Sequence, residues 1–498
     1  MNEQTRAKHF ELAVIGGGSG GFAAALAAAR LGVKTLLVEK ADCLGGTSTR
    51  GGVNAWEPGA GGTGIPFDLY LRIKRGPKAV GVYSLGRHCC YYRKDREPYV
   101  FPGGLSVIDP HLHYVDTLRR YGLGGMVGNE AVYRKLHHGV TFEPQAMADE
   151  MLRMLQETGC CEVMFDTCFV RAVREGGKVR AAELSGGAAV TADAFVDGTD
   201  GRLCAAAGCE TMTGQEARSR FHEPDAPETA NLRVNGASLI YRVRKCARQA
   251  IAPLPDGIPE KCWWQGRFPV AFMNTYPNGD LNINMLPSME GAECVKLGGE
   301  AALAECRRRA LAHWHHLQTE SAEFREYEMC WVAPMLGVRE TRRVVGEYVL
   351  NENDLRAGIS GQRHPDVIAI ADHAMDTHGA GTGRAGCGEL TQPYGVPYRC
   401  LVPKGFKNLL IAGRAASMSS LAASSCRLSR TMMAFGQAAG TAVALAKRLG
   451  VALPDVPSDP LRQALREQHA QVDWPTPQEL ERHLLQDVLM DAEREEPA

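Results

Sequence analysis

The sequence has little net charge, no long uninterrupted hydrophobic run and no metal-binding spacing of cysteines. Its 56 basic and 57 acidic residues nearly cancel, so no global field favours nucleic acid or an anionic membrane surface as a partner. The most apolar stretch, residues 13–31, is interrupted by glycines, whereas a membrane span needs about 20 predominantly apolar residues. The first ten residues lack the apolar core of a signal peptide. We therefore expect a cytoplasmic protein without a membrane span.

The 16 cysteines include no Cys-x-x-Cys motif. This absence argues against a zinc ribbon or an iron–sulfur cluster held by this chain. Without a signal peptide, the cysteines are expected to be reduced thiols rather than a disulfide framework. The histidine-rich segment His313–His316 follows three arginines, and we interpret it as part of a helix. No metal site is predicted.

Residues 11–46 contain the most informative pattern in the chain. A short apolar run, Leu12–Ile15, meets glycines spaced Gly16-x-Gly18-x-x-Gly21, and a small-residue helical stretch follows. A second apolar run then ends at Glu39. This order of strand, glycine turn, helix, strand and acid is the context that a dinucleotide-binding fingerprint requires.

Each part of the fingerprint has a physical role. Gly16 permits a tight turn, Gly18 lets a pyrophosphate approach the backbone, and Gly21 allows close packing of the helix on the strand. The helix N-terminus beginning at Ser19 offers free N–H groups to the phosphates. Glu39, followed by Lys40, is placed to accept hydrogen bonds from a ribose diol. The alternative is a glycine-rich turn in an unrelated βαβ unit.

A second glycine-rich segment follows the fingerprint. Gly45-Gly46-Thr47 and then Gly51-Gly52 suggest another close approach of backbone to ligand. Residues 59–64 also satisfy the Gly-x-Gly-x-x-Gly spacing, but no strand precedes them and Pro66 follows. We therefore interpret residues 59–64 as a loop.

A chain of 498 residues is expected to form two or three domains. Helices are predicted over residues 142–158, 299–317 and 431–449, and two more in the tail, over 460–469 and 477–492. Strands are predicted at residues 162–169, 178–184, 188–192, 238–243, 270–286, 341–350, 367–371 and 408–414. The segment 270–286 contains Asn278-Gly279, which is a hairpin signal.

These residues resemble the FAD-dependent oxidoreductases of the glutathione-reductase-like fold, on the branch with fumarate reductase and succinate dehydrogenase flavoproteins. The resemblance covers residues 10–450, and the order of the matching segments is more specific than any one of them. After the fingerprint, the matching segments are Ala194–Gly201, Gly337–Tyr348, Met375–Gly379, Val396–Gly405, Asn408–Arg414 and Gly436–Gly440.

The resemblance implies an α/β fold with a Rossmann-type FAD-binding domain and an inserted α+β substrate domain. We expect the FAD-binding domain to comprise residues 10–65, 141–215 and 395–450, and the substrate or cap domain residues 66–140 and 216–394, with a helical tail over 451–498. The fingerprint and the resemblance together predict cofactor contacts from Gly16, Gly18, Ser19, Gly21, Glu39, Lys40, Gly45, Gly46, Thr47, Gly52, Phe169, Asp200, Gly413, Arg414 and Leu428.

Two departures from related families refine this expectation. The covalent flavoproteins of the branch carry a histidine after the second glycine motif, whereas residues 47–50 contain none, so we expect non-covalent FAD. The disulfide reductases carry a second dinucleotide fingerprint and a redox Cys-x4-Cys near the flavin. Cys204 and Cys209 have that spacing but follow the strand that ends at Gly201, so we interpret them as packing residues.

Three residues are candidates for catalysis. Arg339 could hold a substrate carboxylate or deliver a proton, and its alternative role is in an ion-pair cluster with Glu340, Arg342 and Arg343. If residues 341–350 continue a strand through this segment, Arg339 and Arg343 share one face. His378 could be a general acid or base, and its alternative role is to cap loop backbone. Arg427, before the helix that the resemblance directs at the flavin, could contact flavin or substrate.

We therefore expect an oxidoreductase that transfers a hydride between a small organic molecule and FAD. Two alternatives stay open. One is a flavin monooxygenase, although Gly413-Arg414 stands where that class usually has Gly-Asp. The other is a flavoprotein subunit that passes electrons to a partner protein. The sequence also leaves open a homo-oligomer, and it identifies neither the substrate nor the direction of the reaction.

Overall fold

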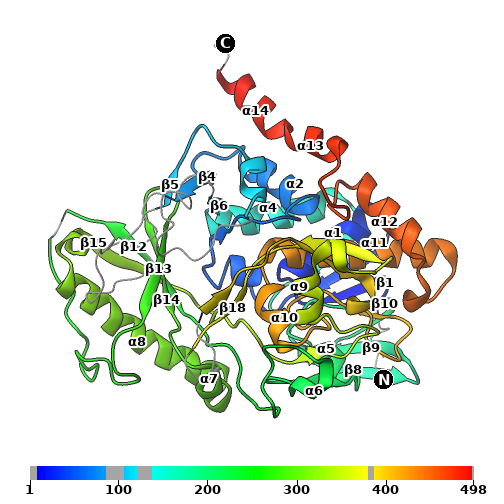
Figure 1. Ribbon diagram of the computed structural model, residues 1–498, viewed down its shortest axis with the longest axis horizontal. Helices are drawn as coiled ribbons and strands as arrows, with labels where there is room; N and C mark the ends of the chain where they lie inside the picture. Colours follow the sequence, from blue (N-terminus) through cyan, green and yellow to red (C-terminus); the bar gives the residue numbers. More distant parts are fainter. Residues whose placement is uncertain (1–7, 86–105, 121–136, 248, 380–385, 496–498) are drawn as a thin grey trace, which may run out of the picture.

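The computed structural model describes residues 8–85, 106–120, 137–247, 249–379 and 386–495 (Figure 1). Part of the region that we expected to cover the ligand, residues 86–105 and 121–136, lies outside the described residues. Within the described residues, no helix combines the length and the apolar character that crossing a bilayer would require.

A mixed sheet forms the centre of the larger body. Its parallel strands lie in the order β7, β2, β1, β10, β21, and the antiparallel strands β9 and β8 extend it beyond β10. The sequence therefore forms an α/β fold of the Rossmann type, as predicted. The strands are β1 (Lys8–Ile15), β2 (Thr35–Val38), β7 (Cys161–Met164), β8 (Phe169–Glu175), β9 (Lys178–Leu184), β10 (Ala189–Asp197) and β21 (Leu409–Ile411).

Two small-residue helices from opposite ends of the chain pack tightly together beside this sheet. They are α1 (Ser19–Arg30) and α11 (Ser429–Leu449). A Cβ atom at Gly436 would lie 2.0 Å from the carbonyl oxygen of Gly20, and one at Gly440 would lie 2.2 Å from that of Ala24. The two helices can approach this closely only because these positions carry no side chain.

A second, smaller core lies apart from the central sheet (left in Figure 1). Its four antiparallel strands have the order β13, β14, β12, β15, and one long helix packs on one face. The predicted hairpin over residues 270–286 is present as β13 and β14. The elements are β12 (Ile240–Lys245), β13 (Val270–Thr275), β14 (Leu281–Leu286), β15 (Tyr327–Val332) and α8 (Gly299–Glu320).

A third sheet connects the two bodies. The C-terminal helices cover part of the larger body. The sheet has the order β3, β6, β4, β5. The buried carboxylate of Asp487 accepts a hydrogen bond from the backbone N–H of Tyr114, at 2.7 Å. The elements are β3 (Ala55–Trp56), β4 (Val80–Leu85), β5 (Ser106–Ile108), β6 (His138–Phe142), α2 (Ile65–Ile73), α4 (Pro144–Glu157), α12 (Ser458–Glu467), α13 (Gln478–Leu484) and α14 (Gln486–Glu495).

The remaining elements are short. They are α5 (Arg202–Ala206), α6 (Arg218–Phe221), α7 (Gly291–Leu297), α9 (Glu352–Gly361), α10 (Ser420–Ser425), β11 (Thr211–Met212), β16 (Arg343–Val344), β17 (Val367–Ala371), β18 (Met375–Thr377), β19 (Gly386–Gly388) and β20 (Tyr394–Pro397).

The strand predicted over residues 341–350 is wrong in extent, because only β16 within it is a strand. The backbone N–H groups of this segment bond to different parts of the chain. Those of Val344, Val345 and Glu347 donate to the carbonyls of Ala415, Glu210 and Val402, respectively. A segment whose partners are scattered in this way forms no continuous ladder, so the expected alternation of side chains does not hold along it.

The larger core includes residues from regions that we assigned to the cap and to the tail. Val344, Ile368 and Met375 pack in it, as do Leu461 and Leu480. The smaller core lies within residues 239–336. The limits of the two predicted domains stay a prediction, but the side-chain packing groups residues 343–375 with the larger body.

The contact between α1 and α11 gives the first testable prediction. Substituting Gly440→Ala places a methyl group against backbone that cannot rotate away, so the midpoint of thermal unfolding should fall, by the equivalent of about 1–3 kcal/mol. The matched control is Gly299→Ala at the start of α8, where a Cβ meets nothing within 4 Å. That control should be neutral or slightly stabilising, because alanine favours helix. Equal midpoints for the two variants would contradict the interpretation.

Candidate active site

The glycines of the fingerprint divide into two kinds. A Cβ at Gly21 would lie 1.8 Å from the carbonyl oxygen of Gly16, and a Cβ at Gly16 would lie 2.7 Å from the carbonyl carbon of Gly198. These glycines are required by the packing of the protein itself. Gly18 differs, because a Cβ there would meet only the carbonyl oxygen of Gly198, at 3.9 Å. Its φ of −66° is open to any residue, so the protein alone does not explain a glycine at this position.

The second glycine motif lies against the first. The N–H of Gly45 donates to the carbonyl of Gly17 at 2.9 Å, and Gly18 and Gly45 form a parallel bridge. Gly46 and Thr47 then form a short 3₁₀ turn, Gly46–Ser48. The hydroxyl of Ser48 donates to that of Ser429 in the first turn of α11, at 3.0 Å. The loop therefore joins the N-termini of α1 and α11.

Glu39 lies at the end of β2, beside this loop. Its carboxylate accepts hydrogen bonds from the backbone N–H groups of Gly17 at 2.6 Å and Ala41 at 2.9 Å. The side chain is thus held next to the N-terminus of α1, where we predicted a ribose contact. Lys40, the next residue, is exposed.

Residues from the far end of the chain continue the same surface. The guanidinium of Arg414 pairs with the carboxylate of Asp200 at 3.0 Å. A Cβ at Gly413 would meet only the carbonyl oxygen of Thr199, at 3.7 Å, so this glycine also leaves space unfilled by protein. Leu428 caps the N-terminus of α11. Packing within the protein does not require glycine at position 18 or position 413. These two glycines flank a surface that has the hydrogen-bond donors and the space that a dinucleotide needs.

Two predicted cofactor residues have other surroundings. A Cβ at Gly52 would lie 2.9 Å from Cγ2 of Ile240 and 3.0 Å from Cζ3 of Trp331. The absence of a side chain at Gly52 is thus explained by its contact with the smaller sheet. Phe169 begins β8 and pairs with Leu184. A role in cofactor binding stays a prediction for both residues.

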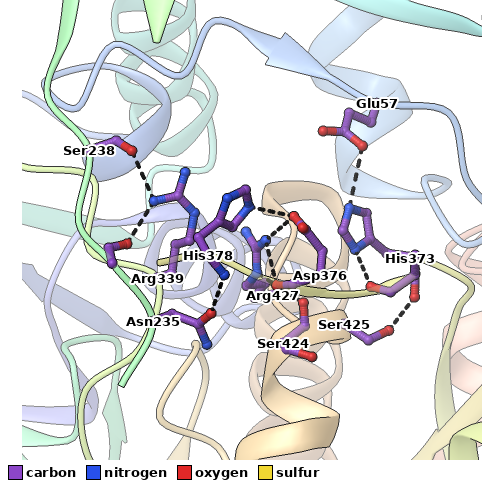
Figure 2. Close-up of polar contacts among 12 residues, drawn as sticks. Glu57, Asn235, Ser238, Arg339, His373, Asp376, His378, Ser424, Ser425 and Arg427 are labelled. Carbon is purple, nitrogen blue, oxygen red and sulfur yellow. Dashed lines mark hydrogen bonds and ion pairs between the residues drawn. The ribbon is translucent and has the colours of Figure 1, made fainter. Parts of the chain in front are cut away.

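The three predicted catalytic residues come together at the end of β18 (Figure 2). Nε2 of His378 lies 2.6 Å from the Asp376 carboxylate, and the same carboxylate oxygen accepts a hydrogen bond from Arg427 at 2.8 Å. Burial alone would raise the pKa of Asp376, but the hydrogen bond from His378 and the positive charge of Arg427 hold it below its ordinary value. Asp376 is therefore ionised, and Nε2 of His378 carries the proton that it accepts.

Nδ1 of His378 has no hydrogen-bond partner in the described part of the chain. Burial, reinforced by the positive charge of Arg339, lowers the pKa of His378 to about 4, although Asp376 acts in the opposite direction. The ring is thus neutral at physiological pH, with Nε2 protonated and Nδ1 available as a base.

Arg339 lies beside His378 and has only neutral partners among the described residues. Its guanidinium donates to the carbonyl of Gly236 at 2.8 Å and to the hydroxyl of Ser238 at 3.0 Å (Figure 2). Burial and the like charge of Arg427 lower the pKa of Arg339 to about 9. A buried cation without an anionic partner is costly.

Arg343, by contrast, is a structural residue. Its guanidinium is fully buried and pairs with the carboxylates of Glu216, at 2.6 Å, and Glu340. Of the two roles that we weighed for this basic segment, the ion-pair cluster describes Arg343 and does not describe Arg339. The sequence did not distinguish the roles of Arg339 and Arg343, because the predicted strand placed both side chains on one face.

The backbone of His378 is held by a second segment. Its N–H donates to Oδ1 of Asn235 at 2.8 Å, and its carbonyl accepts from the N–H of Gly236 at 2.9 Å. Nδ2 of Asn235 in turn donates to Glu340 at 2.8 Å. The dipeptide Asn235-Gly236 thus contacts both His378 and Arg339.

A second acid–histidine pair stands beside this group (Figure 2). Nε2 of His373 lies 3.4 Å from the carboxylate of Glu57, and Arg120 donates to the same oxygen at 3.1 Å. Burial opposes ionisation, but the hydrogen bond from His373 and the charge of Arg120 hold the pKa of Glu57 well below its ordinary value.

Asp376, Asn235 and Ser238 belong to the site but were not predicted from the sequence. Asp376 could have been found, because it lies two residues before His378 and alternate residues of an extended segment share a face. Asn235 and Ser238 carry no such signal, since only the fold brings them to residues 339 and 378.

The two kinds of glycine give a direct test of dinucleotide binding. Gly18→Ala should fold and should unfold thermally near the wild-type temperature without ligand, but it should lose bound dinucleotide, because its methyl group enters space reserved for ligand. Gly21→Ala should fail to fold stably, since its Cβ would collide with backbone. Absorbance of bound cofactor and circular dichroism measure the two properties. Normal cofactor content in Gly18→Ala would contradict this assignment of the site.

Comparison with known proteins identifies the family. No curated protein matches the sequence. Three similar solved structures are a geranylgeranyl bacteriochlorophyll reductase-like protein from Thermoplasma acidophilum (11% identity, 98% of this chain and 100% of that chain, TM-score 0.45), the myxobacterial chondrochloren halogenase (13%, 93% and 79%, 0.41) and L-proline dehydrogenase from P. horikoshii (12%, 93% and 100%, 0.37). Likenesses at this level carry no argument about function. The family model for FAD dependent oxidoreductases, however, matches residues 11–465, and the chain therefore belongs to this family.

Proposed function

We propose that the protein is an oxidoreductase that transfers a hydride between a small organic acid and non-covalently bound FAD. The observation that supports this most is the pairing of two side chains. Arg339 is partly buried and has no anionic partner among the described residues, and His378 is neutral, with no described residue bonded to its Nδ1. The first suits a substrate carboxylate and the second suits the proton that accompanies hydride transfer.

The residues of the glycine loops fit FAD. Gly18 and Gly413 leave space next to backbone, and the N-termini of α1 and α11 provide N–H groups and positive dipole for phosphate and flavin. Glu39 is held where a ribose would lie. Residues 47–50 contain no histidine, which supports non-covalent binding. Bound FAD would supply the two-electron acceptor or donor for the hydride.

Arg339 binds the substrate in this proposal. A carboxylate accepts two parallel hydrogen bonds from a guanidinium, and charge-assisted bonds of this kind are stronger than neutral ones. The anion would also compensate the charge that burial leaves without a partner. Ser238 and the carbonyl of Gly236 fix the orientation of the guanidinium before substrate binds, which reduces the entropy lost on binding.

His378 moves the proton. In the oxidation of an alcohol or amine, a hydride leaves carbon and a proton leaves oxygen or nitrogen, and Nδ1 of His378 accepts this proton. In the reverse reaction the same atom donates it. Asp376 holds the ring through Nε2, and Arg427 holds Asp376. Arg427 is thus a positioning residue for His378. The geometry serves either direction, and the physiological electron partner would decide between them.

The charges around His378 predict opposite shifts in its titration. Removing the positive charge with Arg339→Met should raise the pKa of His378 above about 4, and removing the negative charge with Asp376→Asn should lower it. The proton-accepting form would be lost as the pH falls through each of these values. NMR titration of ¹³C-labelled histidines, with His378→Gln to assign the signal, measures the pKa without a known substrate. Shifts in the same direction for both variants would refute the proposed charge arrangement.

Arg339 also predicts anion binding that can be measured before a substrate is known. Small carboxylates such as butanoate should perturb the absorbance of the FAD-loaded protein, and Arg339→Met should weaken this binding by about tenfold to a hundredfold, as for loss of a charged hydrogen bond. The matched control is Arg233→Met, at an exposed arginine, which should bind normally. Unchanged binding in Arg339→Met would exclude the proposed role.

A further inference from the structure

The smaller sheet presents its two faces to different surroundings. Tyr241 and Ile283 belong to the face that packs on α8, where the Tyr241 hydroxyl bonds to His313. The opposite face meets the glycine-rich loop of the larger body. Nδ2 of Asn282 donates to the carbonyl of Gly52 at 2.7 Å, and Ile240 contacts Gly52. This second face therefore lies against the glycine-rich loop of the larger body.

Three asparagines lie on this second face. Asn274 is directly opposite Asn282 in the β13–β14 ladder, and Asn284 is two residues further along β14. Residues directly opposite, and residues two apart on one strand, share a face. All three amides therefore face the larger body.

The side-chain oxygens of two of the three asparagines have no hydrogen-bond partner among the described residues. Asn282 is satisfied by Gly52 and by the Tyr276 hydroxyl. In the part of the chain that the structure describes, the buried Oδ1 atoms of Asn274 and Asn284 have no partner, and Asn274 is only 3% exposed. A buried acceptor without a donor costs free energy, and buried polar groups of folded proteins are generally paired. Among the described residues, no donor reaches these two oxygens.

The unpaired oxygens lie near Arg339. Asn284 is directly opposite Ile240 in the β14–β12 ladder. Ser238, which bonds to Arg339, precedes Ile240 by two residues. Two residues of extended chain span at most about 7 Å and paired strands lie about 5 Å apart, so the backbones of Ser238 and Asn284 lie within roughly 12 Å of each other. One small molecule can therefore reach both the guanidinium and the asparagine amides.

We propose that Asn274 and Asn284 form the second half of the substrate site. In this site, Arg339 holds the carboxylate of an organic acid. An amino group at the other end of the same molecule donates hydrogen bonds to both amide oxygens, or a hydroxyl there donates its one hydrogen bond to either of them. The inference rests on the proposed function, and it narrows the substrate class to acids that carry a hydrogen-bond donor remote from the carboxylate.

The first test uses matched acids and the FAD-loaded protein. Butanoate, pentanoate and hexanoate are each compared with the corresponding terminally hydroxylated acid, and binding is followed by flavin absorbance. In the wild-type protein at least one hydroxy acid should bind about five- to tenfold more tightly than its parent, as expected for one hydrogen bond. Asn284→Leu or Asn274→Leu, whichever removes the acceptor of this one hydrogen bond, should abolish that preference while still binding the parent acid.

The second test measures stability without any acid. Asn274→Leu and Asn284→Leu should unfold at or above the wild-type temperature, because each removes an unpaired buried polar group. Asn282→Leu should unfold at a lower temperature, because it leaves the Gly52 carbonyl without its donor.

The outcomes separate this inference from the proposed function. If carboxylates bind through Arg339 but hydroxylation has no effect, or if Asn274→Leu and Asn284→Leu are destabilised like Asn282→Leu, bound water satisfies these oxygens and the inference is overturned alone. If no carboxylate binds to the wild-type protein, both are overturned.

Discussion

The close contact of α1 with α11 is the constraint on which the rest of the structure depends. Gly436 and Gly440 on one helix meet the backbone of Gly20 and Ala24 on the other. Because no side chain separates the helices, the segment before α11 lies next to the glycine loops near the start of the chain. The Ser48–Ser429 hydrogen bond records this proximity. Residues more than three hundred positions apart thus form one surface, and Arg427 reaches Asp376 from it.

Two arginines in one short segment show how the surroundings decide a role. Arg343 is fully buried, and two carboxylates compensate its charge. Arg339 is partly buried, and its hydrogen-bond partners in the described chain are a carbonyl and a hydroxyl. The first arrangement is complete without a ligand. Arg339 therefore keeps a positive charge that no carboxylate in the described chain compensates by a direct contact. This difference in surroundings, and not the residue type, makes Arg339 the candidate for binding an anion.

The sequence predicted the features that depend on nearby residues and missed those that depend on the fold. The strand–glycine–helix order of residues 12–39 and the hairpin around Asn278-Gly279 are local, and both were predicted correctly. Arg339, His378 and Arg427 were named separately, but their meeting at Asp376 depends on how α10 and β18 pack. The asparagine pair could not be seen at all, because Asn274 and Asn284 become significant only through the strand register and through the absence of partners.

The chain passes from the larger body into the smaller one, and returns, at a single place. Ser238 and Gly337 exchange two backbone hydrogen bonds, at 3.0 and 2.8 Å, and everything between them forms the sheet with α8. Arg339 follows this junction directly, and Asn235 precedes it. Arg339 and Asn235 therefore belong to the larger body and not to the segment between Ser238 and Gly337. Replacing the segment between Ser238 and Gly337 would therefore change the sheet that faces Arg339 while leaving Asn235 and Arg339 in place.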